Sequence, residues 1–376
     1  MSTVGVVGAG IVGLAHAWSA ARRGHLVTVF ERGPAALGAS VRNFGMIWPI
    51  GQPAPGRHEV AMRSRAAWLE LGREAGVWVD ACGSIHLAHR DDEWAVLEEF
   101  ARKGPDLGYD VELIDPDEVL RRSPGANPDG LLGGLFSPTE LCVNPRTAVP
   151  GLAAWLAQRF GVRFEFDTAI THVEADPGRA RTADGRYFLF ERCFICNGSD
   201  FETLFPSLFR ASGLRRCKLQ MLRTVPQPGG WRLGTHLASG LTLRHYENFK
   251  ICQSLKKLRC RIADETPELD RFGIHVMASQ NDAGGVILGD SHEYDDAIGP
   301  FDKAEIDDLI LRELRRVVRL PDWTIAERWH GVYAKDPNVL MFEAEPLPGV
   351  HVRTATGGAG MTLAFGLAER SWERWS

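Results

Sequence analysis

Residues 3–13 read TVGVVGAGIVG, and after a helix-like stretch residues 26–30 read LVTVF. Such valine-rich runs are typical of buried parallel strands. Between them, Gly8, Gly10 and Gly13 have the G-x-G-x-x-G spacing, which permits a tight turn, close approach of the backbone to a pyrophosphate, and close contact between helix and strand. The positive end of the helix would face the anion. The stretch therefore predicts a unit that binds a dinucleotide.

The kind of dinucleotide depends on Glu31, which ends the second strand. A carboxylate at this point accepts hydrogen bonds from ribose hydroxyls and argues against a 2′-phosphate. Arg32 beside it leaves NADP as an alternative, and a glycine turn that packs without any ligand is another. Residues 32–56 are long, irregular and rich in Gly and Pro, which interrupts the pattern of a nicotinamide dehydrogenase. Because so long a loop is usually functional, we expect its backbone to lie against the cofactor.

The composition is that of a soluble globular protein with two domains. The chain has 376 residues, of which 44% are hydrophobic and 24% charged, and its net charge is −5. We expect no nucleic-acid partner, because no large basic cluster is present, and no membrane partner, because no apolar run has spanning length. Seven cysteines and no signal-peptide pattern favour the cytoplasm. We expect no metal site, since Cys193 and Cys196 would point to opposite faces of a strand.

The middle of the chain carries several helix and strand signals. Asn144, followed by a proline, predicts a helix start, and Gly161 predicts the end of that helix. Residues 214–289 are expected to form several β segments. Asp302 and Glu305 predict a capping box at the start of a later helix.

The C-terminal stretch 353–363 reads RTATGGAGMTL and precedes a helix-like segment. A second glycine-rich helix start at this end of the chain predicts that the C-terminus returns to the first domain. A glycine turn used for packing is the alternative.

Together these motifs resemble the D-amino acid oxidase, glycine oxidase and sarcosine oxidase family of FAD-dependent oxidoreductases. The likeness spans the chain and is carried by GAGIVG (8–13) with Glu31, residues 40–45, VNP (143–145), NG (197–198), WHGVY (329–333) and residues 356–363. Within the family, ASVRNFGM (39–46) and GGAGMT (357–362) resemble a subgroup associated with aminophosphonate breakdown.

The resemblance implies an α/β fold (α+β, two-domain). A glutathione-reductase-type FAD-binding Rossmann domain would be assembled from residues 1–80, 142–212 and 327–376. A substrate-binding domain with a mostly antiparallel β-sheet would comprise residues 81–141 and 213–326. Relatives with covalent flavin carry a cysteine near the region of 329–333, where this sequence has none, so FAD is expected to bind non-covalently.

The resemblance also implies which residues contact FAD. The glycine turn would contact the pyrophosphate, and Glu31 would contact the adenosine ribose. The loop after Glu31 would run along FAD from the phosphates to the flavin ring. The C-terminal glycines would contact the pyrimidine edge of that ring. The expected cofactor residues are Gly8, Gly10, Ile11, Val12, Gly13, Glu31, Arg32, Ala39, Ser40, Arg42, Asn43, Phe44, Gly45, Val173, Asn197, Gly198, Gly357, Gly358, Ala359, Gly360, Met361 and Thr362.

The substrate is expected to carry an anion other than an α-carboxylate. Amino-acid-oxidising relatives bind the carboxylate with an arginine where this sequence has Tyr333. No catalytic side chain is singled out, because the flavin supplies the redox chemistry. The candidates for binding the substrate anion, each with a surface or structural role as the alternative, are Arg223, Arg244, His245, Tyr246, His330, Tyr333 and Lys335.

The predicted function is oxidation of the C–N bond of a small amine, an aminophosphonate such as an N-methylated or hydroxylated derivative of 2-aminoethylphosphonate. Hydride would pass from the carbon of a neutral amine to flavin N5, and the imine would hydrolyse to aldehyde and amine. An apolar pocket would favour the neutral amine. Either O2, which would yield H2O2, or another electron acceptor would complete the cycle. The alternatives are a glycine, sarcosine or D-amino acid oxidase-like enzyme and a non-catalytic flavin-binding electron-transfer subunit.

Overall fold

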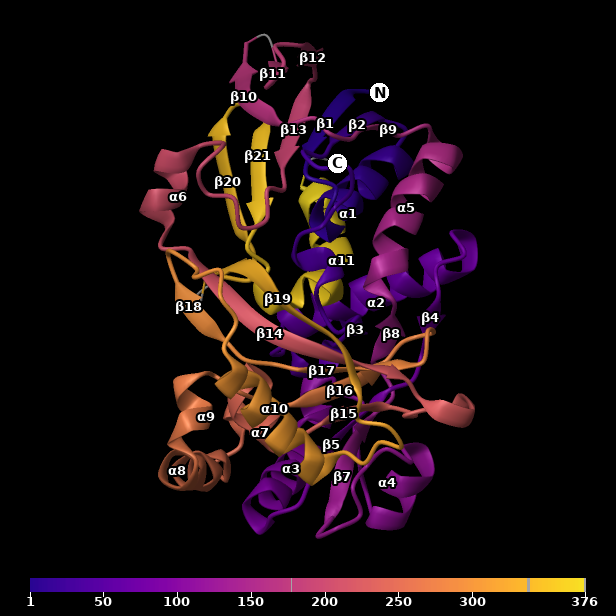
Figure 1. The fold of residues 1–376 in the computed structure, drawn as a ribbon. Coiled ribbons are helices and arrows are strands. Elements are labelled where there is room, and N and C mark those ends of the chain that lie inside the picture. Colours follow the sequence, from indigo (N-terminus) through magenta and orange to yellow (C-terminus); the bar gives the residue numbers. More distant parts are fainter. Residues whose placement is uncertain (177, 337–338, 375–376) are drawn as a thin grey trace.

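The structure, a computed structural model, describes residues 1–176, 178–336 and 339–374. Figure 1 shows a parallel sheet and both chain ends in the upper half, and a large sheet with helices in the lower half. The long strands β14 (Arg215–Pro226) and β19 (Ile325–Lys335) cross the region between them. The α/β two-domain fold class is thereby confirmed, whereas the predicted domain boundaries stay a prediction.

The valine-rich runs of the sequence form the centre of the upper sheet. In the described part of the chain its order is β20-β21-β13-β1-β2-β9, and its pairs are parallel except β20 with β21. Burial explains the apolar sequence of the inner strands, which are β1 (Thr3–Val7), β2 (Leu26–Phe30), β13 (Arg192–Ile195) and β21 (Val350–Thr354). The edge strands β9 (Arg163–Glu165) and β20 (Phe342–Leu347) contain no fully buried residue and carry charged side chains.

The two ends of the chain meet beside this sheet. Helices α1 (Ile11–Arg22) and α11 (Gly360–Glu373), indigo and yellow in Figure 1, pack against each other. The rings of Trp18 and Phe365 meet edge-on with centroids 5.4 Å apart, and Arg23 pairs with Glu369 at 2.9 Å. The C-terminus therefore returns to the first part of the chain, as its glycine-rich stretch predicts.

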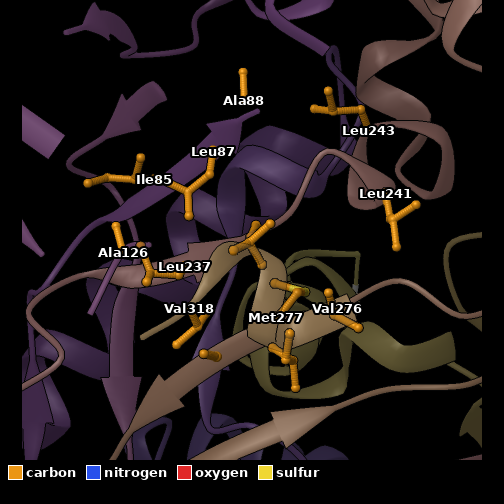
Figure 2. Close-up of a cluster of buried hydrophobic side chains, with 14 of the residues drawn as sticks. Ile85, Leu87, Ala88, Ala126, Leu237, Leu241, Leu243, Val276, Met277 and Val318 are labelled. Carbon is orange, nitrogen blue, oxygen red and sulfur yellow. The ribbon is translucent and has the colours of Figure 1, made fainter. Parts of the chain in front are cut away.

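The lower sheet has the order β18-β14-β17-β16-β15-β5-β7-β6 in the described residues, and β19 also pairs with β14. Its pairs are antiparallel apart from β5 with β15. Its hydrophobic core includes Ile85, Leu87, Leu237 and Met277 (Figure 2). The other strands are β5 (Ser84–Ala88), β6 (Glu112–Ile114), β7 (Gly133–Ser137), β15 (His236–Ala238), β16 (Met277–Gln280), β17 (Gly285–Gly289) and β18 (Glu293–Asp295).

Two small antiparallel sheets complete the strands of the described chain. One joins β3 (Met46–Ile47), β8 (Leu141–Val143) and β4 (Val79–Asp80), and the other joins β10 (Ile170–Ala175), β11 (Gly178–Thr182) and β12 (Tyr187–Leu189). The remaining helices outside residues 241–271 are α2 (Arg57–Glu74), α3 (Asp91–Lys103), α4 (Pro116–Arg122), α5 (Pro145–Phe160), α6 (Pro206–Ser212) and α10 (Ala304–Val317).

The prediction of β segments alone across 214–289 is wrong for residues 241–271. That stretch forms α7 (Leu241–His245), α8 (Leu255–Glu265) and α9 (Pro267–Arg271). The sequence signal was present, because Leu255, Leu258 and Ile262 recur at helical spacing, and all three are buried in the core shared with α3.

Helix termini bear out one cap prediction and overturn another. The Asn144 side chain accepts a hydrogen bond from the Arg146 amide at the start of α5, and Gly161 adopts φ 69° at its end. Helix α10 instead begins at Ala304 without a side-chain cap, so the predicted capping box is wrong. Asp302 forms an ion pair with Lys218 at 2.8 Å and lies within hydrogen-bond distance, 2.9 Å, of His330 Nδ1, and these tertiary contacts displace the local cap.

None of the helices in the described ranges combines the length and apolar character needed to cross a bilayer. The predicted cytoplasmic location stays a prediction.

Candidate active site

A cavity of about 1180 Å³ is lined by residues of both the upper and the lower sheet. It exceeds the range of roughly 300–1,000 Å³ that drug-sized ligands occupy. One part is formed by the glycine turn after β1, the loop after β2 and the start of α11. Another is formed by β14, the end of β19 and the segments around α7 and β16.

The glycine turn has no room for side chains. Gly8 adopts φ 104°, and a Cβ there would lie 2.4 Å from the carbonyl oxygen of Cys196. A Cβ on Gly13 would lie 1.9 Å from the carbonyl oxygen of Gly8, so this glycine sets the contact between α1 and β1. The Ile11 amide donates to Ser40 Oγ at 2.9 Å. The start of α1 thus faces the cavity, as an anion-binding helix end requires.

Glu31 directly follows β2 at the edge of the cavity. Its carboxylate accepts hydrogen bonds from the amides of Ala9 at 3.0 Å and Gly33 at 3.2 Å. Held in this way, the carboxylate suits a ribose hydroxyl better than a phosphate. Arg32, which had suggested NADP as an alternative cofactor, forms an ion pair with Asp200 at 2.9 Å.

The irregular loop after β2 forms a wall of the cavity, and Asn43 fixes its shape. The Asn43 side chain donates to the carbonyl oxygens of Ala39 and Ser40 at 3.0 and 2.9 Å, and its Oδ1 accepts from the Gly45 amide at 2.8 Å. Across the cavity, the start of α11 is held by Thr362, whose Oγ1 accepts from the Trp48 amide at 2.9 Å.

Nearly all of the expected cofactor residues lie together on this cavity. Gly13 and Gly45 instead contact backbone behind the wall, where a Cβ on Gly45 would lie 2.0 Å from the Val143 carbonyl oxygen. Val173 is buried in a neighbouring core, and residues 168–171 line the cavity in its place. The individual contacts with the cofactor stay predictions.

The sequence model of the family described as "FAD dependent oxidoreductase" (DAO) matches residues 3–373. The chain belongs to the DAO family of FAD-dependent oxidoreductases. Its cofactor is FAD, and the glycine cradle and the size of the cavity fit that group. This DAO-family chain is an FAD-dependent oxidoreductase.

Comparisons with individual proteins agree with the family. The chain is 26% identical over 433 residues to D-amino acid dehydrogenase of Phenylobacterium zucineum (strain HLK1), covering 97% of this chain and 91% of that one. Glycine oxidase of Bacillus cereus ATCC 14579 has the same fold, with TM-score 0.77, 18% identity and coverage of 98% and 93%. Iminodiacetate oxidase of Chelativorans sp. BNC1 gives TM-score 0.71, 17% identity and coverage of 98% and 93%.

The predicted substrate residues divide into two groups. Arg244, His245, Tyr246, Tyr333 and Lys335 line the cavity together. The other two predicted residues lie outside its lining, where Arg223 pairs with Glu327 and His330 with Asp302, each at 2.9 Å.

Tyr333 and Lys335 lie beside the C-terminal glycines. Lys335, the last residue of β19, forms a β-bridge with Thr356, and a Cβ on Gly358 would lie 3.3 Å from the Tyr333 hydroxyl. Lys335 Nζ donates to the hydroxyl of Tyr294 at 3.0 Å. Burial lowers the pKa of Lys335 below its ordinary value, and it raises the pKa of Tyr333 well above its ordinary value. Tyr333 is therefore a neutral hydroxyl donor.

Several lining residues were missed by the sequence analysis. His275, Asp290 and His292 come from the ends of β16 and β17, and Arg57 and Lys250 come from helical segments. No local motif marks any of them. Their common position depends on strand pairing and, for Lys250, on a helical segment at Glu247–Ile251 that lies within the region expected to be β.

Proposed function

We propose that this enzyme oxidises the C–N bond of a small amine that also carries a phosphonate, such as N-methylated or hydroxylated 2-aminoethylphosphonate. The observation that carries the proposal is that the arginines lining the cavity are already bound to other groups of the protein. In the described lining, each arginine already has a partner: Arg32 has Asp200, Arg42 has the carbonyl of His330, Arg57 has Glu247, and Arg244 has Asp270.

The protein cation that we expect to bind the substrate's phosphonate is an ammonium group and not a guanidinium group. A bidentate arginine binds carboxylates and phosphonates alike, but a phosphonate has three oxygens, which an ammonium and several hydroxyls can also share. Lys335 offers the ammonium. Tyr246 and Tyr333 offer hydroxyls that stay protonated at neutral pH, because burial raises the pKa of each.

Apolar side chains would select the neutral amine. Met46, Trp48, Leu219, Met221 and Met277 line the cavity, and such surroundings depress the pKa of an amine and exclude water. Bound FAD would supply the acceptor for the hydride. The chain's own contribution would be to hold the anion at Lys335 and thereby orient the carbon next to the amine nitrogen.

The overall reaction balances without any further group from the chain. The N–H proton and a hydride leave the CH–NH unit, and a C=N bond forms. Water then adds to the imine, giving an aldehyde that keeps the phosphonate and a free amine. The electrons pass to O2 or to another acceptor.

A glycine or sarcosine oxidase-like activity is the second candidate. Arg57 favours it, because its side chain lines the cavity, is 30% exposed and is paired with the exposed carboxylate of Glu247 at 3.3 Å. A substrate carboxylate could replace that partner. The fold shared with glycine oxidase is consistent with this reading.

Matched substrates separate the two candidates. N-methyl-2-aminoethylphosphonate and N-methyl-β-alanine have the same chain length and differ in the anion. We expect kcat/KM to be about 10–100-fold higher for the phosphonate, the size of one or two charge-assisted hydrogen bonds. Oxygen uptake and an artificial electron acceptor should both be used. A preference for the carboxylate, or for glycine and sarcosine, would defeat the phosphonate proposal.

A further inference from the structure

Three histidines meet at one end of the cavity. His245 ends α7, His275 precedes β16, and His292 follows β17. Their ring centroids are 3.8 Å (245–275), 4.6 Å (245–292) and 4.9 Å (275–292) apart. One ring nitrogen from each lies within 4.8 Å of the others. All three residues line the cavity, so an additional ligand could reach them from it.

Hydrogen bonding decides which nitrogens carry protons. His292 Nδ1 lies 3.1 Å from the carbonyl oxygen of Gly273. A carbonyl oxygen only accepts, so the proton lies on Nδ1 and the lone pair of the neutral ring lies on Nε2. Asp290 Oδ1 lies 3.2 Å from His275 Nδ1, but the two atoms form no hydrogen bond. Both ring nitrogens of His275 are buried and have no hydrogen-bond partner in the described chain.

The hydrogen-bond geometry favours a cation over an anion. His292 keeps its proton on Nδ1 against the Gly273 carbonyl, so its Nε2 offers a lone pair. An anion bound there would need a second proton on the ring, whereas a cation takes the lone pair as it is.

We propose that His245, His275 and His292 form a binding site for a divalent transition metal ion of the zinc type. Three imidazoles and one open position are a common zinc donor set, and all three histidines line the cavity. The Gly273 carbonyl orients His292, and Asp290, whose Oδ1 lies 3.2 Å from His275 Nδ1, is close enough to orient the His275 ring once a metal ion is bound.

The nearby charges are compatible with a cation. Lys335 and Arg244 are close enough to lower the pKa values of His245, His275 and His292. Arg244 is paired with Asp270. Lys335 donates to the Tyr294 hydroxyl at 3.0 Å and would bind the substrate anion, and Asp290 supplies a carboxyl group within the cluster. The metal site goes beyond the proposed function. It also departs from the expectation of no metal site, which was based on Cys193 and Cys196 alone.

The test is metal binding by the flavin-loaded enzyme. The protein is treated with chelator, equilibrated with ZnCl2, desalted and analysed for zinc. We expect about one zinc per chain and, with Co2+, tetrahedral absorption bands on the long-wavelength side of the flavin spectrum. His275→Ala and His292→Ala should weaken binding by at least 100-fold, and Asp290→Asn by roughly 10–100-fold.

His172→Ala is the matched control, because His172 is an exposed histidine beside Glu174, far from the cluster in sequence. It should bind zinc as the wild type does. His292→Gln replaces His292→Ala if the alanine variant loses its flavin. Failure of the wild type to retain zinc, or equal retention by His172→Ala and the cluster variants, would overturn the proposal. Because the readout is metal content, it is independent of amine oxidation and of the proposed function.

Discussion

The carboxylate of Glu31 accepts a hydrogen bond from the backbone amide of Ala9 at 3.0 Å. This bond joins the end of β2 to the glycine turn that follows β1, so the acid and the helix start face the same cavity. The two features that predict a dinucleotide in the sequence are thus physically linked in the fold.

Replacing Glu31 with alanine should weaken FAD binding by about 10–100-fold, since a hydrogen bond to a charged group contributes roughly 1.5–3 kcal/mol. The measurement is a fluorescence titration of apoprotein with FAD. Glu59→Ala, at an exposed position on α2, is the control and should bind FAD as the wild type does. Equal affinities for all three proteins would show that Glu31 does not contact the cofactor.

Gly13→Ala should destabilise the enzyme by about 1–3 kcal/mol, because the new Cβ would lie 1.9 Å from the Gly8 carbonyl oxygen and would force α1 away from β1. Gly151→Ala is the matched change in α5, where a Cβ would meet nothing within 4 Å. It should stabilise the protein by roughly 0.5–1 kcal/mol. Urea unfolding of both variants measures the difference, and a Gly13→Ala protein as stable as the wild type would contradict this packing.

Phe365→Leu should lower FAD affinity as well as stability, because Phe365 packs on Trp18 at the junction of α1 and α11. Phe249→Leu changes an equally buried phenylalanine in the core of the lower sheet. Each should cost about 1 kcal/mol of unfolding free energy. If both variants bind FAD as tightly as the wild type, the contact between the chain ends does not support the cofactor site.

The parts of the molecule that sequence reasoning predicted are those whose signals are local. The glycine turn, Glu31 and the caps of α5 each depend on residues close together in the chain, and the structure bears out their geometry. Asp302 failed as a cap because its contacts with Lys218 and His330, both distant in sequence, outweighed a local hydrogen bond.

The substrate end of the cavity was less predictable for the same reason. His245, His275 and His292 are separated by 30 and 17 positions in the printed sequence, and they meet because of the pairing of β16 with β17 and the position of α7. Arg223 and His330 have the right chemistry for an anion site. Whether each faces the cavity is fixed by the register of β14 with β19, which the sequence does not reveal.

Lys335→Met should lower kcat/KM for N-methyl-2-aminoethylphosphonate by about 10–100-fold, mainly through KM, because it removes the ammonium proposed to bind the phosphonate. Lys256→Met, at an exposed position on α8, is the control and should not change either constant. Steady-state kinetics with the phosphonate and with N-methyl-β-alanine make the comparison. An equal loss for both substrates would indicate that Lys335 does not distinguish the anions.

The most direct test of the account is to mix the oxidised enzyme with N-methyl-2-aminoethylphosphonate without oxygen and to follow the visible band of the flavin. We expect the band to bleach, and methylamine and a phosphonate-bearing aldehyde to be released in equal amounts. A flavin that stays oxidised with this phosphonate and its hydroxylated and primary-amine analogues, yet bleaches with glycine or sarcosine, would contradict it.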